Sequence, residues 1–254
     1  MLLQERKIEL KSAREIGLMR RSGRMVAEIL QALRGEIRPA GTTLELDALA
    51  ERLTLKGGAR PAFKNYRGYR HTICASVNDQ VVHGVPGKKP LAEGDIVGID
   101  FGVVIDGFYG DSAVTIPVGA IEDSTQALLK AGAEALRLGV EKAAPGNRLN
   151  DIGAAIQTYA ESQGYSVVRE MVGHGIGRAL HEEPQVPNYG RPDTGLRLKA
   201  GMVLAIEPMI NAGEKEIETL DDEWTVVTRD GSLSAHFEHT VAITENGPEI
   251  LTKV

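Results

Sequence analysis

The chain has 254 residues, of which 42% are hydrophobic and 25% charged, so it is long enough to bury a substantial core. Its formal net charge of −6 leaves no basic footprint for DNA or RNA, and its one cysteine, Cys74, excludes an intrachain disulfide. Nothing between its segments has the composition of a linker, so we expect a single domain over residues 1–254.

Targeting signals are not expected. Residues 1–6 contain no apolar core of signal-peptide length, and no apolar run reaches the ~18 residues that a transmembrane helix needs. With a lone cysteine, this pattern predicts a cytoplasmic protein that does not enter a membrane.

The first half of the chain predicts two helices followed by strands. Ser12 to Glu15 have the form of a capping box, and apolar residues follow at near-helical spacing. A second amphipathic helix is predicted over 43–55, ended by Gly57-Gly58. Strand patterns then cover 72–77 and 80–82.

A β-hairpin is predicted over residues 96–111. The runs on either side of Asp106-Gly107 are rich in β-branched residues, and an Asp-Gly pair is a strong hairpin signal. If Gly107 takes the left-handed position of a type I turn with a glycine bulge, Val104 faces Gly107. On that register Asp100 lies directly opposite Asp111, on one face of the hairpin.

Two facing aspartates on apolar strands are destabilising unless something offsets their charge. A divalent cation would turn the repulsion into a set of ligands. The alternative is a solvated edge hairpin with two surface aspartates, and a one-residue register slip would turn the faces over. The apolar residues around Asp100 favour the cation site.

The second half repeats the order of elements. Helices are predicted over 124–138 and 149–163, the latter stopped by Gly164. Two successive halves of helix, helix and strand predict an α+β fold, with helices outside a curved antiparallel sheet. The predicted strands are 166–172, 202–206, 224–228 and 234–243, with Asn246-Gly247 turning a last hairpin.

Three further candidate ligands occur in or at the ends of apolar segments. His174 lies between glycines, Glu207 precedes Pro208, and Glu238 follows Phe237. Any one of them alone is more often a structural or surface residue. With the two aspartates they form four carboxylates and one imidazole, a set that suits two divalent cations such as manganese, iron, cobalt or zinc. The lack of a cysteine cluster excludes a structural zinc site.

These residues resemble a known family. In order and context they are similar to the creatinase/aminopeptidase ("pita-bread") family, M24, and the chain most resembles its type I methionine aminopeptidases. The resemblance covers nearly the whole chain and implies a pita-bread fold. The motifs that carry it are Val82-His83-Gly84-Val85-Pro86, the Asp100/Asp111 hairpin, 174–184, 206–208 and 237–240.

The resemblance implies hydrolytic removal of the N-terminal (initiator) methionine from nascent proteins and peptides whose second residue is small. Asp100 and Asp111 would hold one cation, and Asp111 and Glu238 would bridge it to a second cation held by His174 and Glu207. Water between two cations loses a proton readily, which supplies the nucleophile near neutral pH.

It also implies the roles of residues around the metals. Glu207 would shuttle the proton, His181 would bind the scissile carbonyl, and His83 would contact the scissile amide. Structural alternatives are a strand-end role for His83 and capping of Glu182 by His181. The three other histidines, His71, His236 and His239, match no catalytic role.

An apolar pocket for the methionine side chain is also implied. In this family a phenylalanine is expected where Leu180 stands, and a smaller residue is common where Phe63 stands. A plain buried cysteine describes Cys74 equally well. The implied lining residues are Phe63, Tyr66, Tyr69, Cys74, Leu180 and Trp224.

Three alternatives fit the sequence less well. A proline-specific peptidase would use the same five ligands, but such enzymes usually carry an extra N-terminal domain, and fewer than a hundred residues precede Asp100. A type II enzyme would carry a long insertion between Glu207 and Glu238, for which there is no room. A non-catalytic binding module would typically have lost ligands. We expect a monomer, while the metal and any ribosome association stay open.

Overall fold

The computed structural model describes residues 8–254. The first six residues, for which the sequence predicts no signal-peptide core, lie outside the described part. Within residues 8–254, no helix is both long and apolar enough to cross a bilayer.

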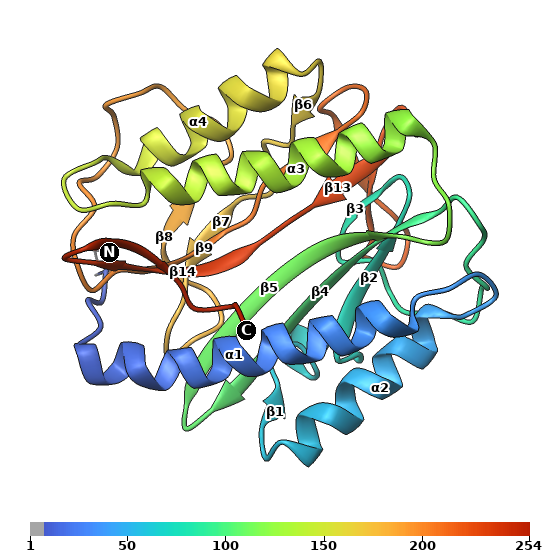
Figure 1. The fold of residues 1–254 in the computed structure, drawn as a ribbon, viewed down its shortest axis with the longest axis horizontal. Coiled ribbons are helices and arrows are strands. Elements are labelled where there is room, and N and C mark those ends of the chain that lie inside the picture. The colour runs from blue at the N-terminus through green and yellow to red at the C-terminus, as the bar shows by residue number, and fades with distance from the viewer. Residues whose placement is uncertain (1–7) are drawn as a thin grey trace.

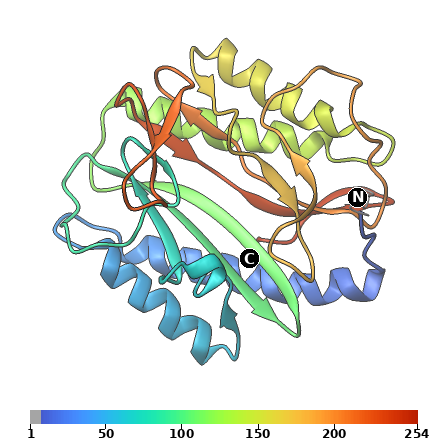
Figure 2. The ribbon, with the colours of Figure 1, turned by 180° about the vertical axis from the view of Figure 1, so that it is seen from behind.

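Two pairs of helices enclose the strands between them. Helices α1 (Ala13–Glu36) and α2 (Thr43–Lys56) lie on one side, and α3 (Asp123–Lys142) and α4 (Leu149–Ser162) lie on the other (Figure 1). Seen from behind, the strands and their loops lie in front of the helices (Figure 2). The predicted α+β fold with helices outside and two similar halves is therefore confirmed.

The strands in the described residues form two main sheets and two small ones, and all the pairings are antiparallel. The first-half sheet contains β1 (Arg60–Pro61), β2 (Ile73–Val77), β4 (Ile96–Ile105) and β5 (Phe108–Pro117). The second-half sheet contains β7 (Gly173–Gly175), β8 (Glu182–Val186), β9 (Val203–Ile206), β14 (His239–Thr244) and β15 (Gly247–Ile250). The small sheets contain β3 (Gln80–Val82), β11 (Ile217–Thr219) and β12 (Val226–Thr228), and β6 (Ser166–Val167), β10 (Met209–Asn211) and β13 (Ser234–His236).

Helix α1 begins where the sequence predicts. The Ser12 hydroxyl accepts from the backbone N–H of Glu15, and the Glu15 carboxylate accepts from the backbone N–H of Ser12, which completes the capping box. The apolar stripe of the helix is buried against the first-half sheet. Its buried apolar residues are Ile16, Met19, Val26, Ile29, Leu30 and Leu33.

The hairpin of β4 and β5 has a different register from the predicted one. Asp106 (φ 51°) and Gly107 (φ 79°) are both left-handed, so they form a two-residue turn, and Ile105 pairs with Phe108. Asp100 therefore lies opposite Ala113, and Asp111 lies opposite Gly102. The predicted direct pairing was wrong because aspartate tolerates positive φ and closes the shorter turn.

The two aspartates still lie on one face of the hairpin, as predicted. The new partner of Asp100 is two residues away from Asp111, and residues two apart on a strand share a face. Gly102 leaves room beside Asp111, because a Cβ at Gly102 would lie 3.2 Å from its Oδ1 atom. The aspartates are diagonal neighbours on one face of the hairpin.

Two predicted strands of the second half are interrupted. The strand predicted over 166–172 is limited to β6, and the strand predicted over 234–243 is broken between β13 and β14. Phe237 and Glu238 lie in that break, where Phe237 packs into the core beside α3. The last hairpin is present, with Glu245 and Asn246 between its paired ends.

Candidate active site and metal centre

One cavity of about 190 Å³ brings together every site residue named from the sequence. Its carboxylates and His174 come from both main sheets and from the ends of their strands. It is also lined by Arg67, which the sequence did not single out. The predicted residues in its wall are Phe63, Tyr66, Tyr69, Cys74, His83, Asp100, Asp111, His174, Leu180, His181, Glu207, Trp224 and Glu238.

Buried carboxylate oxygens without partners mark one side of this cavity. One oxygen each of Asp100, Asp111 and Glu238 is buried and accepts no hydrogen bond. Ligand atoms of Asp111, His174 and Glu238 lie within 4.8 Å of one another. Buried polar groups are normally satisfied, so three such oxygens together indicate a group that the carboxylates are built to hold.

Burial and mutual repulsion raise the pKa values of these carboxyls. Burial raises the pKa of Asp100 and of Glu238 well above the ordinary range, and the charge of Asp111 raises both further. Burial likewise raises the pKa of Asp111 and of Glu207 to about 7. Divalent cations would reverse both effects, so this donor set fits a metal centre.

The imidazole of His174 is oriented as a ligand. Its Nδ1–H donates to the carbonyl oxygen of Gly175 at 2.9 Å, which leaves the lone pair on Nε2. The Nε2 atom lies 3.6 Å from Oε1 of Glu207. A backbone carbonyl that fixes the tautomer is the usual companion of a metal-binding histidine.

Hydroxyl side chains join the two halves beside the carboxylates. The Thr240 hydroxyl donates to the carbonyl of Asp111 at 2.7 Å and accepts from the Asp111 N–H at 3.1 Å. The Ser112 hydroxyl donates to the carbonyl of Glu238 at 2.6 Å, and the Glu238 N–H donates to the carbonyl of Ala113 at 2.9 Å. These bonds set Glu238 of the second half beside Asp111 of the first.

Two histidines in the wall are neutral near pH 7. Burial lowers the pKa of His181 to about 3 and that of His83 to about 4. The Nδ1 atom of His181 is hydrogen-bonded to the Tyr66 hydroxyl at 2.7 Å, and its ring lies 4.3 Å from the ring of His174. His181 is therefore a neutral imidazole beside His174.

The opposite wall is apolar and aromatic. The rings of Tyr69 and Trp224 meet edge to face at 4.9 Å, and Cys74 of β2 lies buried beside them. Burial raises the pKa of the Cys74 thiol well above its usual range, with Asp100 adding to the shift. This wall offers shape and bulk to a ligand and contains no reactive thiolate.

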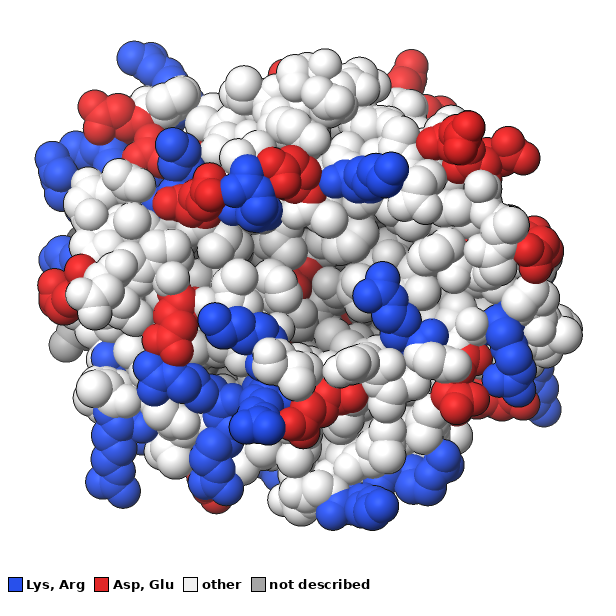
Figure 3. Space-filling view, in the orientation of Figure 1, with Lys and Arg blue, Asp and Glu red and all other residues white. Residues whose placement is uncertain are grey.

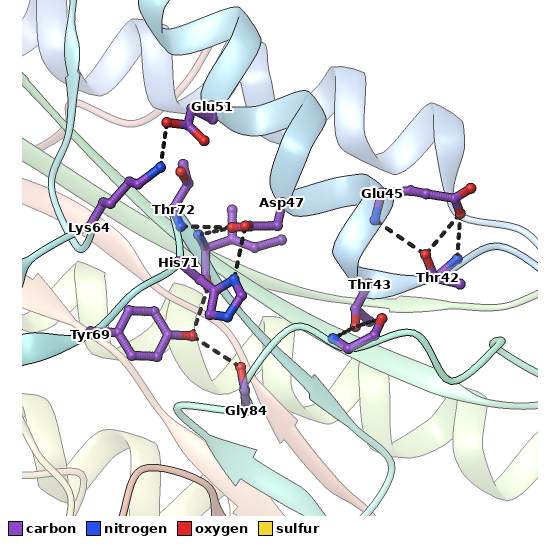
Figure 4. Close-up of polar contacts among 12 residues, drawn as sticks. Thr42, Thr43, Glu45, Asp47, Glu51, Lys64, Tyr69, His71, Thr72 and Gly84 are labelled. Carbon is purple, nitrogen blue, oxygen red and sulfur yellow. Dashed lines mark hydrogen bonds and ion pairs between the residues drawn. The ribbon is translucent and has the colours of Figure 1, made fainter. Parts of the chain in front are cut away.

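A buried aspartate of α2 fixes the strand that carries Cys74. Asp47 accepts from the backbone N–H groups of Thr72 (2.7 Å) and Ile73 (3.0 Å) and from Nδ1 of His71 (3.0 Å) (Figure 4). The hydroxyl of Tyr69 donates to the carbonyl of Ile73 at 2.9 Å. The pocket wall is thus anchored to the helix behind it.

These features agree with the known proteins that the chain is similar to. The model of metallopeptidase family M24 matches residues 17–245. The chain belongs to family M24. It is 55% identical to methionine aminopeptidase 1 of Bacillus subtilis, over 96% of this chain and 98% of that protein. The solved methionine aminopeptidase of Rickettsia prowazekii is 44% identical and superimposes with a TM-score of 0.96, over 97% of this chain and 100% of that chain.

Solved structures with other names share the fold at lower similarity. The prolidase of Pyrococcus horikoshii is 26% identical with a TM-score of 0.78, over 96% of this chain and 63% of the prolidase. The resemblance to type I methionine aminopeptidases, and with it the pita-bread fold, is confirmed by the higher identity and full coverage of those relatives. As a member of family M24 the chain is a metal-dependent peptidase.

Two residues at this M24 site were missed or underrated by the sequence analysis. Arg67, left-handed at φ 50°, lies with its guanidinium 5.4 Å from the centre of the Tyr66 ring. His236 places Nε2 3.5 Å from Oε2 of Glu207, with no hydrogen bond. No pattern signals Arg67, whereas the place of His236 two residues before Glu238 is a signal that could have been used.

A second, more open groove of about 680 Å³ adjoins this cavity. It shares Arg67, His174 and His181 with the smaller cavity and continues over Arg178 and Gln185. Elsewhere on the surface, acidic and basic side chains are interspersed over the face seen in Figure 3.

Proposed function

We propose that the chain removes the N-terminal (initiator) methionine from nascent proteins and peptides whose second residue is small. The observation that supports this most directly is the shared cavity: a carboxylate and histidine cluster faces an aromatic wall across about 190 Å³. An unbranched thioether side chain suits such a wall, and a free N-terminus can approach the cluster. The rest of the substrate would leave through the adjoining groove.

Two divalent cations are part of the proposal. Asp100 and Asp111 would hold one, and Asp111 and Glu238 would bridge it to a second held by His174 and Glu207. Bound there, the cations would polarise the scissile carbonyl and make water more acidic. Cobalt, manganese, iron and zinc all suit these ligands, so elemental analysis of protein purified without added metal identifies the one used.

Glu207 would carry out the proton transfer. Its carboxylate reaches the cluster from the end of β9, where Oε1 lies 3.6 Å from Nε2 of His174. A carboxylate beside the attacking water can accept its proton and later release it. Glu207 would take the proton of the attacking water and pass it to the leaving amine.

The two neutral histidines would handle the scissile peptide group. If the Tyr66 hydroxyl donates to Nδ1 of His181, the imidazole proton would lie on Nε2. His181 would then donate a hydrogen bond from Nε2 to the scissile carbonyl and to the developing oxyanion. His83, left-handed at φ 59° after β3, would contact the scissile amide and assist the leaving group.

The side chain of the substrate methionine would lie against the aromatic wall. We assign this role to Phe63, Tyr66, Tyr69, Cys74, Leu180 and Trp224. We also propose that the whole chain acts as one catalytic domain, as a cytoplasmic monomer. Ribosome association would bring it to nascent chains and is tested by co-sedimentation with ribosomes.

Peptide assays test the activity. Protein stripped of metal and reloaded with each divalent cation should release methionine from Met-Ala and Met-Gly peptides. Cleavage of Xaa-Pro peptides without methionine release would instead identify a proline-specific peptidase. No cleavage of either series with any cation would favour a non-catalytic member of the family.

Substitution of ligands tests the site. Asp100→Asn and Glu238→Gln should each remove bound metal and turnover together while the fold remains. The matched control is Asp106→Asn, because Asp106 lies in the same hairpin but is exposed and paired with Arg21. Full metal content and turnover in either ligand variant would show that the site is wrongly assigned.

A further inference from the structure

The loop between β7 and β8 carries two residues of the cavity wall, Leu180 and His181. One carboxylate holds the start of this loop. Oε1 of Glu182 accepts from the backbone N–H of Arg178 at 2.7 Å and from that of Ala179 at 3.1 Å. Because Glu182 directly follows His181, its carboxylate fixes the loop on both sides of the imidazole.

A lysine that lies 171 positions earlier in the sequence holds this carboxylate in place. Nζ of Lys11 forms an ion pair with Oε2 of Glu182, and the side chains are only 5% and 14% exposed. Nζ also donates to the carbonyl of Glu9 at 3.2 Å, and the Lys11 N–H donates to the carbonyl of Gly201 at 2.6 Å. Lys11 is therefore fixed at its backbone and at its ammonium group.

The loop is shaped around this lysine. A Cβ at Gly177 would overlap Cε of Lys11 and would lie 2.8 Å from Oε1 of Glu182. The carbonyl of Gly177 accepts from the N–H of Tyr109 at 2.9 Å, which ties the loop to the tip of β5. The ion pair thus occupies a space that any larger residue at 177 would fill.

Helix α1 supports the outer side of the same loop. The guanidinium of Arg178 donates to Glu15 at 3.1 Å and lies 4.4 Å from the centre of the Phe108 ring. Inside the cavity, His181 contacts the hydroxyl of Tyr66 and the ring of His174. The segment 11–15 is therefore the outer support of a loop whose inner side faces the metal centre.

A buried ion pair contributes little net stability compared with an apolar pair, because desolvation cancels most of the attraction. What it adds is a defined position for the groups it joins, because charged hydrogen bonds have a preferred geometry. We propose that Lys11 is a positioning residue that, through Glu182, sets His181 for the scissile carbonyl. The inference rests on the proposed methionine aminopeptidase activity.

The test is a double-mutant cycle on metal-saturated protein with a Met-Ala peptide. Lys11→Met should lower kcat by about 10- to 100-fold, as expected for a misplaced group, with metal content unchanged. In a His181→Ala background the same change should have no further effect on kcat, because Lys11 acts through His181. Lys11→Arg should restore most of the wild-type kcat.

Two more variants keep the test decisive. Glu182→Gln retains an oxygen for the two backbone N–H groups but removes the charge that pairs with Lys11. It should lower kcat as much as Lys11→Met does, and it serves as the test if the Lys11→Met protein does not fold. Lys215→Met, at an exposed ion pair with Glu216, controls for loss of a lysine and should keep the wild-type kcat.

The proposal is overturned if Lys11→Met lowers the melting temperature but leaves kcat unchanged, or if it slows the His181→Ala variant as much as the wild type. Either result would make the ion pair merely structural. Failure of the proposed function is a separate outcome. It would appear as wild-type protein that releases no methionine at all.

Discussion

Replacing Asp47 with alanine should destabilise the protein strongly, because this carboxylate satisfies three donors behind the pocket wall (Figure 4). Thr72 and Ile73 are fully buried, so their backbone N–H groups would lose their acceptor out of reach of water. Each unsatisfied buried donor costs about 1–3 kcal/mol. With the contact to His71 also lost, we expect a loss of about 3–5 kcal/mol in the free energy of unfolding.

Asparagine at position 47 separates the contributions. Its carbonyl oxygen can replace Oδ1, which accepts from Thr72 and Ile73, while its amide group replaces Oδ2, which accepts from His71. Asp47→Asn should therefore cost only about 1–2 kcal/mol, the loss of one charged hydrogen bond. Both variants should also raise KM for methionine peptides, the alanine variant more than the asparagine variant. The reason is that the carbonyl of Ile73 accepts from the hydroxyl of Tyr69, which lines the pocket.

Urea unfolding followed by circular dichroism measures these differences. The matched control is Glu51→Ala on the same helix, since Glu51 forms a half-exposed ion pair with Lys64 at 2.6 Å, also seen in Figure 4. Such a pair contributes about 0–1 kcal/mol. The reasoning is refuted if Asp47→Ala costs no more than Glu51→Ala, or if the alanine and asparagine variants are equally unstable.

Three further predictions concern charge, reactivity and packing. In metal-free protein, burial raises the pKa of Asp111 and of Glu207 to about 7 and raises the pKa of Asp100 and of Glu238 well above the ordinary range, whereas carboxyls in the unfolded chain have pKa values of about 4. Between these pKa values the folded state binds more protons than the unfolded chain, so the free energy of unfolding should fall as the pH rises from about 5 to 7, by up to about 1.4 kcal/mol per pH unit for each proton, and the melting temperature should fall with it. A saturating divalent cation should abolish the fall, and a flat profile without metal would contradict the assignment. The Cys74 thiol should resist iodoacetamide in the native protein and react only in urea, because it is buried and its pKa is raised; rapid native labelling would contradict this placement. Gly23→Ala should lower the unfolding midpoint, because a Cβ there overlaps the carbonyl of Leu251, whereas Gly35→Ala on the same helix meets no atom within 4 Å and should be neutral or stabilising.

Most of the fold could be predicted because its signals are local. The capping box of α1 and the Asp-Gly hairpin lie where the sequence placed them. The hairpin register could not be predicted, because it depends on whether Asp106 or only Gly107 takes a positive φ, and both choices fit the same residues. The faces of Asp100 and Asp111 were still predicted correctly, because the actual register differs from the expected one by a whole period of the strand.

Some of the site residues could likewise be predicted from the sequence, and others could not. Asp100, Asp111 and Glu238 stand out because carboxylates within apolar strands are costly. Arg67 and Lys11 do not stand out, because nothing distinguishes a functional arginine or a buried lysine from the many exposed ones in the sequence. Their places follow from long-range packing of the η1 turn (Tyr66–Gly68) and of the 176–181 loop.

The hydroxyl contacts of Ser112 and Thr240 have a consequence for how the protein matures. The carboxylates of β4 and β5 belong to the first half of the chain, and His174, Glu207 and Glu238 to the second. A growing chain that ends before Glu238 presents an incomplete set of charges with no shared cavity. Metal uptake would then occur only after both halves have emerged and docked, so cation affinity would report completed folding.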